Sequence, residues 1–232
     1  MSFEIFSLGP KGWGDELLHG LAVTAATSGV AFVLALLFGA LGAAAKLSGT
    51  WTVRALGQGY TTVFRGVPEL LVLYLVFFGG DMLLSAVAQT VFGVGGGFKT
   101  PVFAVGVLAI GICAGAYCAE VMRGAALAVP RGTLEAADSL GLTRWQRFRL
   151  VLAPIALRIA LPGLGNILQI TIKESALISV VGLAELLRQA AVAAGSTRQP
   201  FTFYIAAAFL FYALTLLVQV ETRRIERRTR WA

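Results

Sequence analysis

Long stretches without a charged residue are the feature that most constrains the fold of this chain. The first stretch, residues 19–45, contains no lysine, arginine, aspartate or glutamate, and a helix needs roughly 20 apolar residues to cross a bilayer. Only 13% of all residues are charged and 57% are hydrophobic, whereas a soluble domain averages about 25% charged residues. A water-facing surface cannot be built from that composition, so we expect an all-α membrane protein.

The chain has room for about five transmembrane helices and for no sizeable soluble domain. The first stretch is too long for a signal-peptide core and no small-residue cleavage site follows it, so we expect it to be retained. We predict a single transmembrane domain over residues 1–232, in which Gly79, Gly80 and Asp81 end the second span and residues 82–92 form a short extra helix. The predicted spans cover residues 19–45, 67–80, 101–121, 162–183 and 201–220.

Small residues inside two of these spans indicate how the helices pack. Gly29, Gly39 and Gly42 in the first span predict a close approach to a neighbouring helix. Cys113 and Cys118, five residues apart, point to different sides of the third span, so we expect packing residues and no mutual disulfide.

The lysines and arginines outside the predicted spans indicate the orientation. With the N-terminus outside, fourteen fall on the cytoplasmic side and four on the outer side, in the sense of the positive-inside rule. We therefore expect the C-terminus to be cytoplasmic, with the basic run at residues 221–230 as a solvated helix end. The formal net charge of +7 is interpreted as a topology signal and contact with anionic membrane lipid. No basic face with base-stacking aromatics indicates nucleic-acid binding.

The predicted cytoplasmic loop at residues 130–158 is too polar to span a membrane and too long for a simple connector. Apolar residues recur in it at helical spacing, with a break at Gly141 and with Pro154 closing the second piece. We expect two short helices at an angle on the cytoplasmic face. The periodic residues are Leu134, Ala137 and Leu140 in the first piece, and Trp145, Phe148 and Leu152 in the second.

This loop resembles the EAA loop of ABC importer permeases. Glu135-Ala136-Ala137 is followed after three residues by Gly141 and, nine residues further on, by the segment Val151-Leu152-Ala153-Pro154. Ala153 departs from the family pattern, in which leucine is usual. The flanking motifs resemble the polar amino-acid branch, which handles histidine, glutamate, glutamine, arginine and opines, as the histidine/lysine/arginine/ornithine and octopine permeases do. Those motifs are Phe64-Arg65-Gly66-Val67-Pro68, Ala116-Tyr117, Glu120, Arg123-Gly124-Ala125, Val129-Pro130, Gly132, Leu161-Pro162, Asn166 and Thr171-Ile172-Lys173-Glu174-Ser175-Ala176-Leu177.

The resemblance implies a permease subunit in the cytoplasmic (inner) membrane of a bacterium, whose loop is a coupling helix that docks on an ATPase. The implied partners are two cytoplasmic ABC ATPase subunits, a second permease subunit (identical or a sister) and an extracytoplasmic solute-binding protein. ATP and Mg would bind to the partner ATPase, and we expect no cofactor on this chain. Small side chains allow close helix approach, and glycine allows a sharp turn. The residues expected to couple are Glu135, Ala136, Ala137, Leu140, Gly141 and Arg144.

Enzyme motifs are missing from the sequence. A P-loop needs Gly-x-x-x-x-Gly-Lys-Ser/Thr; residues 93–100 come near it, but Phe98 stands where the second glycine is needed, and the segment lies on the predicted outer side. His19 is the only histidine, so no histidine-rich metal site is expected, and we take it to mark the start of the first span. We therefore expect no enzymatic activity of the chain itself.

A polar stripe in the fourth predicted span indicates where substrate could pass. A charge at the centre of a membrane helix costs about 2.5–3.5 kcal/mol. The polar residues of this span lie within an arc of roughly 140° of the helix, so this side of the helix should face a partner or a water-filled path. We hypothesise that Glu174 contacts the cationic part of a substrate while Lys173 serves its carboxylate or a helix pair; an intersubunit ion pair that fixes packing is the alternative. The candidates are Asn166, Gln169, Lys173, Glu174 and, in the second span, Glu69.

Two acidic residues also have a structural interpretation. Glu69 follows Arg65 and Pro68, and Glu120 lies three residues before Arg123 on the same helix face, where the two should pair.

The function favoured by these features is ATP-driven import of polar amino acids, with basic amino acids or opines preferred because of the acidic residue in the stripe. An ion-gradient-driven secondary transporter is one alternative, but it predicts inverted repeats and interrupted helices in both halves, which the sequence does not show. A membrane assembly protein that transports nothing is the other.

Overall fold

The computed structural model describes residues 3–9, 12–92 and 101–229, and every regular element in these ranges is helical. Four helices are long and apolar enough to cross a membrane alone, and a bent helix pair provides a fifth candidate span. The prediction of an all-α membrane chain is confirmed at this level. The elements are a 3₁₀ turn Phe3–Phe6, α1 (Gly14–Lys46), α2 (Trp51–Gly66), α3 (Glu69–Phe92), α4 (Val102–Leu127), α5 (Arg131–Ser139), α6 (Arg144–Arg147), a π segment Phe148–Leu152, α7 (Ala153–Glu174), a 3₁₀ segment Ser175–Val181, α8 (Leu186–Thr197) and α9 (Pro200–Thr229).

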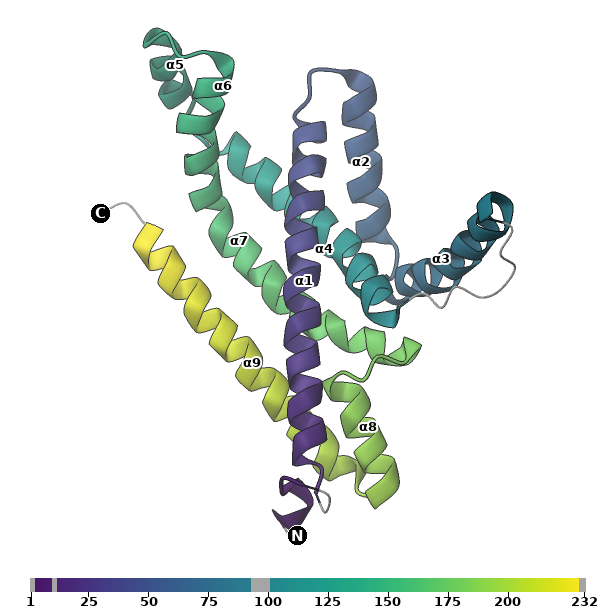
Figure 1. Cartoon of the computed structure of the whole chain (residues 1–232). Helices are drawn as coiled ribbons and strands as arrows, with labels where there is room; N and C mark the ends of the chain where they lie inside the picture. The colour runs from purple at the N-terminus through teal and green to yellow at the C-terminus, as the bar shows by residue number, and fades with distance from the viewer. Residues whose placement is uncertain (1–2, 10–11, 93–100, 230–232) are drawn as a thin grey trace.

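The helices form an elongated bundle around α1 (Figure 1). The N-terminus and α8 lie at one end, while α5, α6 and the connection from α1 to α2 lie at the other. Helix α3 projects away from the bundle. α1 begins at Gly14, earlier than the predicted start near His19, because acidic residues in the first turn are favoured by the helix dipole and do not end the helix.

The contact between α1 and α4 is made by residues with almost no side chain. A Cβ atom added to Gly39 would lie 2.5 Å from Cys118 Cβ, and one added to Gly42 would lie 2.9 Å from Ala119 Cβ. The packing predicted for these two glycines is therefore confirmed. Gly29 is different, because a Cβ atom there would meet nothing within 4 Å, so the predicted close approach at this residue is not made within the described chain.

The second predicted span differs from the structure. Helices α2 and α3 meet at an angle of 107°, and α3 runs without interruption from Glu69 to Phe92. Residues 79–81 are thus not an exit, and residues 82–92 are not a separate helix. The break lies at Pro68, which disfavours helical backbone in the residue before it, and Val67 is extended there, with φ −96° and ψ 136°. Apolar surroundings tolerate the paired glycines inside a helix.

The fourth predicted span also begins earlier than expected. Helical structure continues from Arg144 to Val181, so Pro154 does not close a short helix and Pro162 lies inside α7. Pro154 is accommodated because it sits in the first turn of α7, where a proline removes no needed donor. The π segment that precedes it joins the loop to the membrane helix.

Helices α8 and α9 complete one end of the bundle. α8 falls in a stretch left without structure by the sequence analysis, and it packs against α1 and α9 through a core that includes Leu17, Leu186, Ala190 and Phe203. α9 extends beyond the predicted residues 201–220 into the basic run, which is helical to Thr229.

Gly39→Ala should destabilise the protein, because overfilling a close helix contact costs roughly 1–3 kcal/mol. Gly29→Ala is the matched control, since it adds the same methyl group to the same helix in open space. Thermal melting of the detergent-purified protein, followed by size-exclusion chromatography, measures the difference. Equal melting temperatures for the two variants would contradict the close packing of α1 on α4.

Candidate functional site

The loop formed by residues 130–147, which contains α5 and α6, is held by backbone and capping hydrogen bonds. Gly141 is left-handed, with φ +73°, and it ends α5 in a Schellman motif. In that motif the Leu142 amide donates to the Ala137 carbonyl at 3.2 Å and the Gly141 amide donates to the Asp138 carbonyl at 3.0 Å. The predicted break at Gly141 is therefore confirmed.

Helix α6 begins with a capping box that the sequence analysis missed. The Gln146 amide donates to Thr143 Oγ1 at 3.3 Å, and the Thr143 amide donates to Gln146 Oε1 at 2.9 Å. The signal was present as Thr-x-x-Gln. An ion pair between Arg147 and Asp138, 2.6 Å apart, joins the two arms of the loop.

The 130–147 loop presents an apolar tip to solvent. Leu140 is 80% exposed and Trp145 is 65% exposed. Of the residues predicted to couple, one is buried: Ala137 is only 4% exposed and packs inside the chain. This face of α5 turns inward, and the predicted part of Ala137 in ATPase coupling stays a prediction. The predicted residues that are exposed are Glu135, Ala136, Leu140, Gly141 and Arg144.

A charge cluster lies where α1, α2 and α4 meet. The predicted pair is present, since Arg123 Nε donates to Glu120 Oε2 at 3.1 Å. The Glu120 carboxylate also accepts a hydrogen bond from Lys46 Nζ and lies 3.8 Å from Arg65 Nη1. Lys46 Nζ donates further to Thr61 Oγ1 at 2.9 Å. The links to α1 and α2 could not be predicted from local sequence, because Lys46, Thr61 and Arg65 are far from Glu120 along the chain.

Glu120→Gln should destabilise the protein, because Lys46, whose side chain is only 6% exposed, would lose its carboxylate. We expect the free energy of unfolding to fall by about 2 kcal/mol, which lies between the losses typical of breaking an exposed and a buried ion pair. Glu221→Gln is the control, because its ion pair with Arg224 is exposed and should be worth less than about 1 kcal/mol. Thermal melting of the purified protein compares them, and a smaller loss for Glu120→Gln would refute the clustering.

Two predicted path residues come together from different helices. The Glu174 carboxyl of α7 lies near the Glu69 carboxyl of α3, and both lie within electrostatic range of Tyr117 of α4. The Arg65 guanidinium stacks on the Tyr117 ring, 5.4 Å from its centroid. Two acidic groups near one another favour a cation between them. Lys173 is exposed on another side of α7.

The remaining predicted path residues face a different direction. Asn166 and Gln169 line a small polar pocket of about 160 Å³ together with Gln219 and Thr222 of α9. The predicted polar stripe therefore divides between α9 and the acidic pair, and its role as a substrate path stays a prediction. The reason is that α7 has neighbours on two sides, and an arc of roughly 140° spans both.

Glu185 is a buried acidic residue that the sequence analysis missed. Its carboxylate accepts hydrogen bonds from the Leu187 and Arg188 amides at 2.9 and 2.8 Å and thereby caps α8. Thr24 of α1 donates to it at 3.3 Å. Glu185 lies outside the candidate spans, and burial raises the pKa of its carboxyl while the two amide hydrogen bonds oppose that shift. Its position directly before α8 was the only available signal.

The described part of the chain holds no cluster of three histidine, cysteine or acidic residues arranged for a metal ion. Cys113 and Cys118 are both free and buried, which confirms them as packing residues. The P-loop-like segment at residues 93–100 lies outside the described residues.

Comparison with known proteins finds similarity over nearly the whole chain. Residues 31–231 match the family model described as the binding-protein-dependent transport system inner membrane component. The chain is 51% identical to the nopaline transport system permease protein of Agrobacterium fabrum, covering 100% of this chain and 97% of that protein. It is 37% identical to the histidine/lysine/arginine/ornithine transport system permease protein of Escherichia coli, covering 94% of each.

A solved structure has the same arrangement of helices. The crystal structure of an amino acid ABC transporter with histidines superposes with a TM-score of 0.79 at 33% identity, covering 93% of this chain and 95% of that chain. An inward-facing methionine ABC transporter superposes with a TM-score of 0.68 at 21% identity, covering 93% and 94%, which shows a shared fold.

Proposed function

The chain belongs to the binding-protein-dependent inner-membrane permeases of ABC importers, and from this premise we propose that it imports opines or basic amino acids. The observation that carries the mechanism is the exposed apolar tip of the 130–147 loop, with Leu140 and Trp145 outermost. Large apolar side chains left in water mark a surface that another protein covers.

Family membership has direct consequences. The protein is a multi-pass component of a bacterial inner membrane, and ATP hydrolysis belongs to a separate subunit. Binding-protein-dependent transport implies an ATPase and a solute-binding protein as partners. The two alternatives considered from the sequence, a secondary transporter and a membrane assembly protein, do not fit this family.

The proposed coupling surface consists of Glu135, Ala136, Leu140, Arg144 and Trp145. These side chains are all exposed, and they lie on two short helices that the Schellman motif, the capping box and the Asp138–Arg147 ion pair hold at a fixed angle. A rigid loop can transmit a displacement, since little of the motion is lost within it. Helical structure continues from it into α7, so a push on the tip would move a membrane helix.

Leu140→Asp should remove the ATPase subunit from the purified complex, because a charge would replace the most exposed apolar side chain of the tip. Leu8→Asp is the matched control: Leu8 is 70% exposed and lies near the N-terminus, at the other end of the bundle (Figure 1). Co-purification and substrate-stimulated ATP hydrolysis are the measurements. Unchanged co-purification and transport with Leu140→Asp would mean that the tip does not dock.

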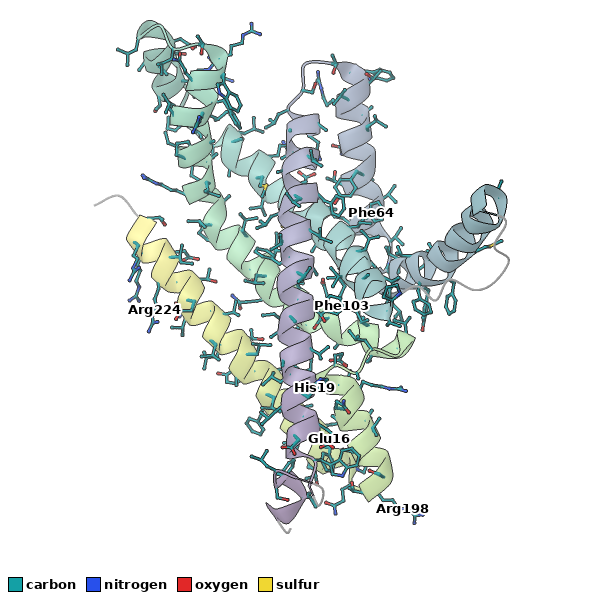
Figure 2. The ribbon with its side chains drawn as sticks, viewed as in Figure 1. Glu16, His19, Phe64, Phe103, Arg198 and Arg224 are labelled. Carbon is teal, nitrogen blue, oxygen red and sulfur yellow. The ribbon has the colours of Figure 1, made fainter. Side chains whose placement is uncertain are left out.

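We also propose that this end of the bundle is cytoplasmic and that the N-terminus is outside. The basic C-terminal part of α9 and the 130–147 loop support this orientation, because cytoplasmic segments carry the excess of arginine. Arg224 lies towards the C-terminal end of α9, whereas Arg198 lies near the opposite end of the molecule (Figure 2).

The substrate class is proposed from the relatives and from the acidic pair. Proteins named for nopaline, octopine, and histidine, lysine, arginine and ornithine transport are 51%, 46% and 37% identical to the chain. Glu69 and Glu174 provide two carboxyl groups near one another, which suits the cationic group of such a substrate. Arg65 lies over the Tyr117 ring, which is within electrostatic range of both carboxyls, and we assign to it the substrate carboxylate.

Glu174→Gln should weaken uptake of arginine relative to a neutral amino acid. Losing a hydrogen bond to a charged group costs about 1.5–3 kcal/mol, which corresponds to roughly a tenfold to hundredfold loss of affinity. The control adds an acidic group towards α9 instead. Gln169→Glu, introduced together with Glu174→Gln, should not restore arginine uptake. Transport into vesicles with the binding protein present measures both, and an unchanged arginine preference in Glu174→Gln would exclude a substrate role.

Two ATPase subunits and a second permease subunit, identical or a sister, complete the proposed assembly. Helix α3 supports the second permease: it projects from the bundle (Figure 1) and exposes Leu71, Leu75 and Phe78. Glu69 is its first residue, so a neighbour packed along α3 would close the path beside the acidic pair.

A further inference from the structure

Helices α7 and α9 separate towards the end of the bundle that carries the loop. They touch at Gly165 and Thr222, where even a single added Cβ atom on the glycine would collide with the threonine methyl group. Beyond this contact, towards the start of α7 and the end of α9, a groove of about 630 Å³ lies between them. The helices thus form a wedge with its apex at Gly165 and Thr222.

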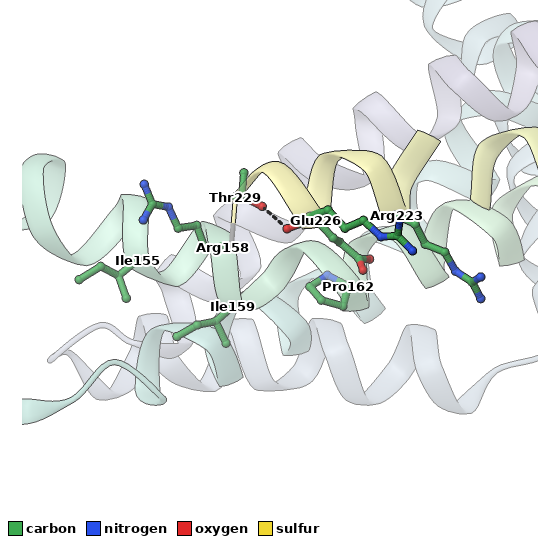
Figure 3. A pocket seen from close by; sticks show the side chains of 8 residues that line it. Ile155, Arg158, Ile159, Pro162, Arg223, Glu226 and Thr229 are labelled. Carbon is green, nitrogen blue, oxygen red and sulfur yellow. Dashed lines mark hydrogen bonds between the residues drawn. The ribbon is translucent and has the colours of Figure 1, made fainter. Parts of the chain in front are cut away.

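The walls of this groove combine positive charge with aliphatic surface. Arg158 comes from α7, and Arg223 and Arg227 come from α9, so both helices contribute guanidinium groups. Glu226 is the one acidic residue among the lining residues of the described chain. The apolar part is formed by Ile155, Ile159 and Pro162 of α7. Figure 3 shows Arg158, Pro162, Glu226 and Arg223 around the groove.

We propose that this groove binds the headgroup of an anionic phospholipid of the phosphatidylglycerol type. Arginine is suited to phosphate because its planar donors can form paired hydrogen bonds. The Glu226 carboxylate can accept hydrogen bonds from the hydroxyl groups of a glycerol headgroup. The aliphatic side chains of α7 provide a surface for the glycerol backbone and the first acyl carbons. Basic pockets between membrane helices on the cytoplasmic side commonly bind such headgroups.

The location of the groove supports a lipid as its occupant. Both helices that form it are candidate membrane spans. Arg158 lies near the start of α7, and Arg223 and Arg227 lie near the end of α9. The chains of a lipid whose phosphate sits in this groove would lie along the aliphatic wall of the groove itself, which Ile155, Ile159 and Pro162 form.

The proposal has a mechanical consequence. A headgroup that bridges Arg158 and the two arginines of α9 would tie the start of α7 to the end of α9. The start of α7 is joined to the 130–147 loop by continuous helical structure. Bound lipid would therefore bias the position of the helix on which the ATPase is proposed to act, and the lipid composition would affect the coupling.

The test compares two double variants of the full assembled complex. R223Q/R227Q removes two charges that line the groove, while R224Q/R228Q removes two charges from the same turns of α9 that do not line it. Each variant is reconstituted in nanodiscs of phosphatidylcholine with added phosphatidylglycerol, and retained phosphatidylglycerol is counted by native mass spectrometry. R223Q/R227Q should weaken retention by about twenty-five-fold, at roughly fivefold for each arginine, and R224Q/R228Q should weaken it far less. R158Q, on the other helix, should weaken it as well.

Other outcomes would overturn the proposal. Equal losses in the two double variants would show only the general attraction of a basic helix end for an anionic surface. Displacement of the lipid by millimolar inorganic phosphate would indicate a site for soluble anions. A disulfide between Ile159→Cys residues of two permease subunits would make the groove a subunit interface. Phosphatidylglycerol retention is measured without transport. Unchanged retention in R223Q/R227Q would therefore leave the proposed import function standing, and a failure of import would not affect this test.

Discussion

The structure depends on the close approach of α1 to α4. In a bilayer the lipid chains are as apolar as leucine, so helices gain little from hiding apolar side chains and associate through close packing and polar contacts instead. Gly39 and Gly42 place the two backbones so near each other that an added methyl group has no space. Tyr60 of α2 then completes the contact, because its hydroxyl donates to the Ile112 carbonyl of α4 at 2.8 Å.

The charged residues are arranged around this packed centre and connect regions with different roles. Glu120 joins α1, α2 and α4 through Lys46, Arg65 and Arg123. Arg65 also lies on Tyr117, which interacts with the acidic pair of Glu69 and Glu174. Arg65 is thus shared between the Glu120 cluster and the Tyr117 ring.

The coupling loop shows how far local sequence can be interpreted. The break at Gly141 followed from glycine's freedom to adopt positive φ, and the structure confirms it. The burial of Ala137 did not follow, since helical periodicity groups residues on a face but does not say whether that face turns to the chain or to solvent. The helix boundaries were difficult to predict for a related reason. Pro154 was expected to end the second loop helix, but after the preceding π segment the helical structure continues through it.

Local sequence was sufficient to predict the membrane class, the approximate positions of four spans, the break in the loop and the family motifs. Each of these depends on local composition or on spacing within a short segment. Tertiary packing sets the 107° bend between α2 and α3, the proximity of Glu174 to Glu69, the contact of Lys46 with Glu120 and the groove between α7 and α9. Those contacts join residues far apart in the chain, and they depend on the rotation and crossing angle of packed helices, which local sequence does not specify.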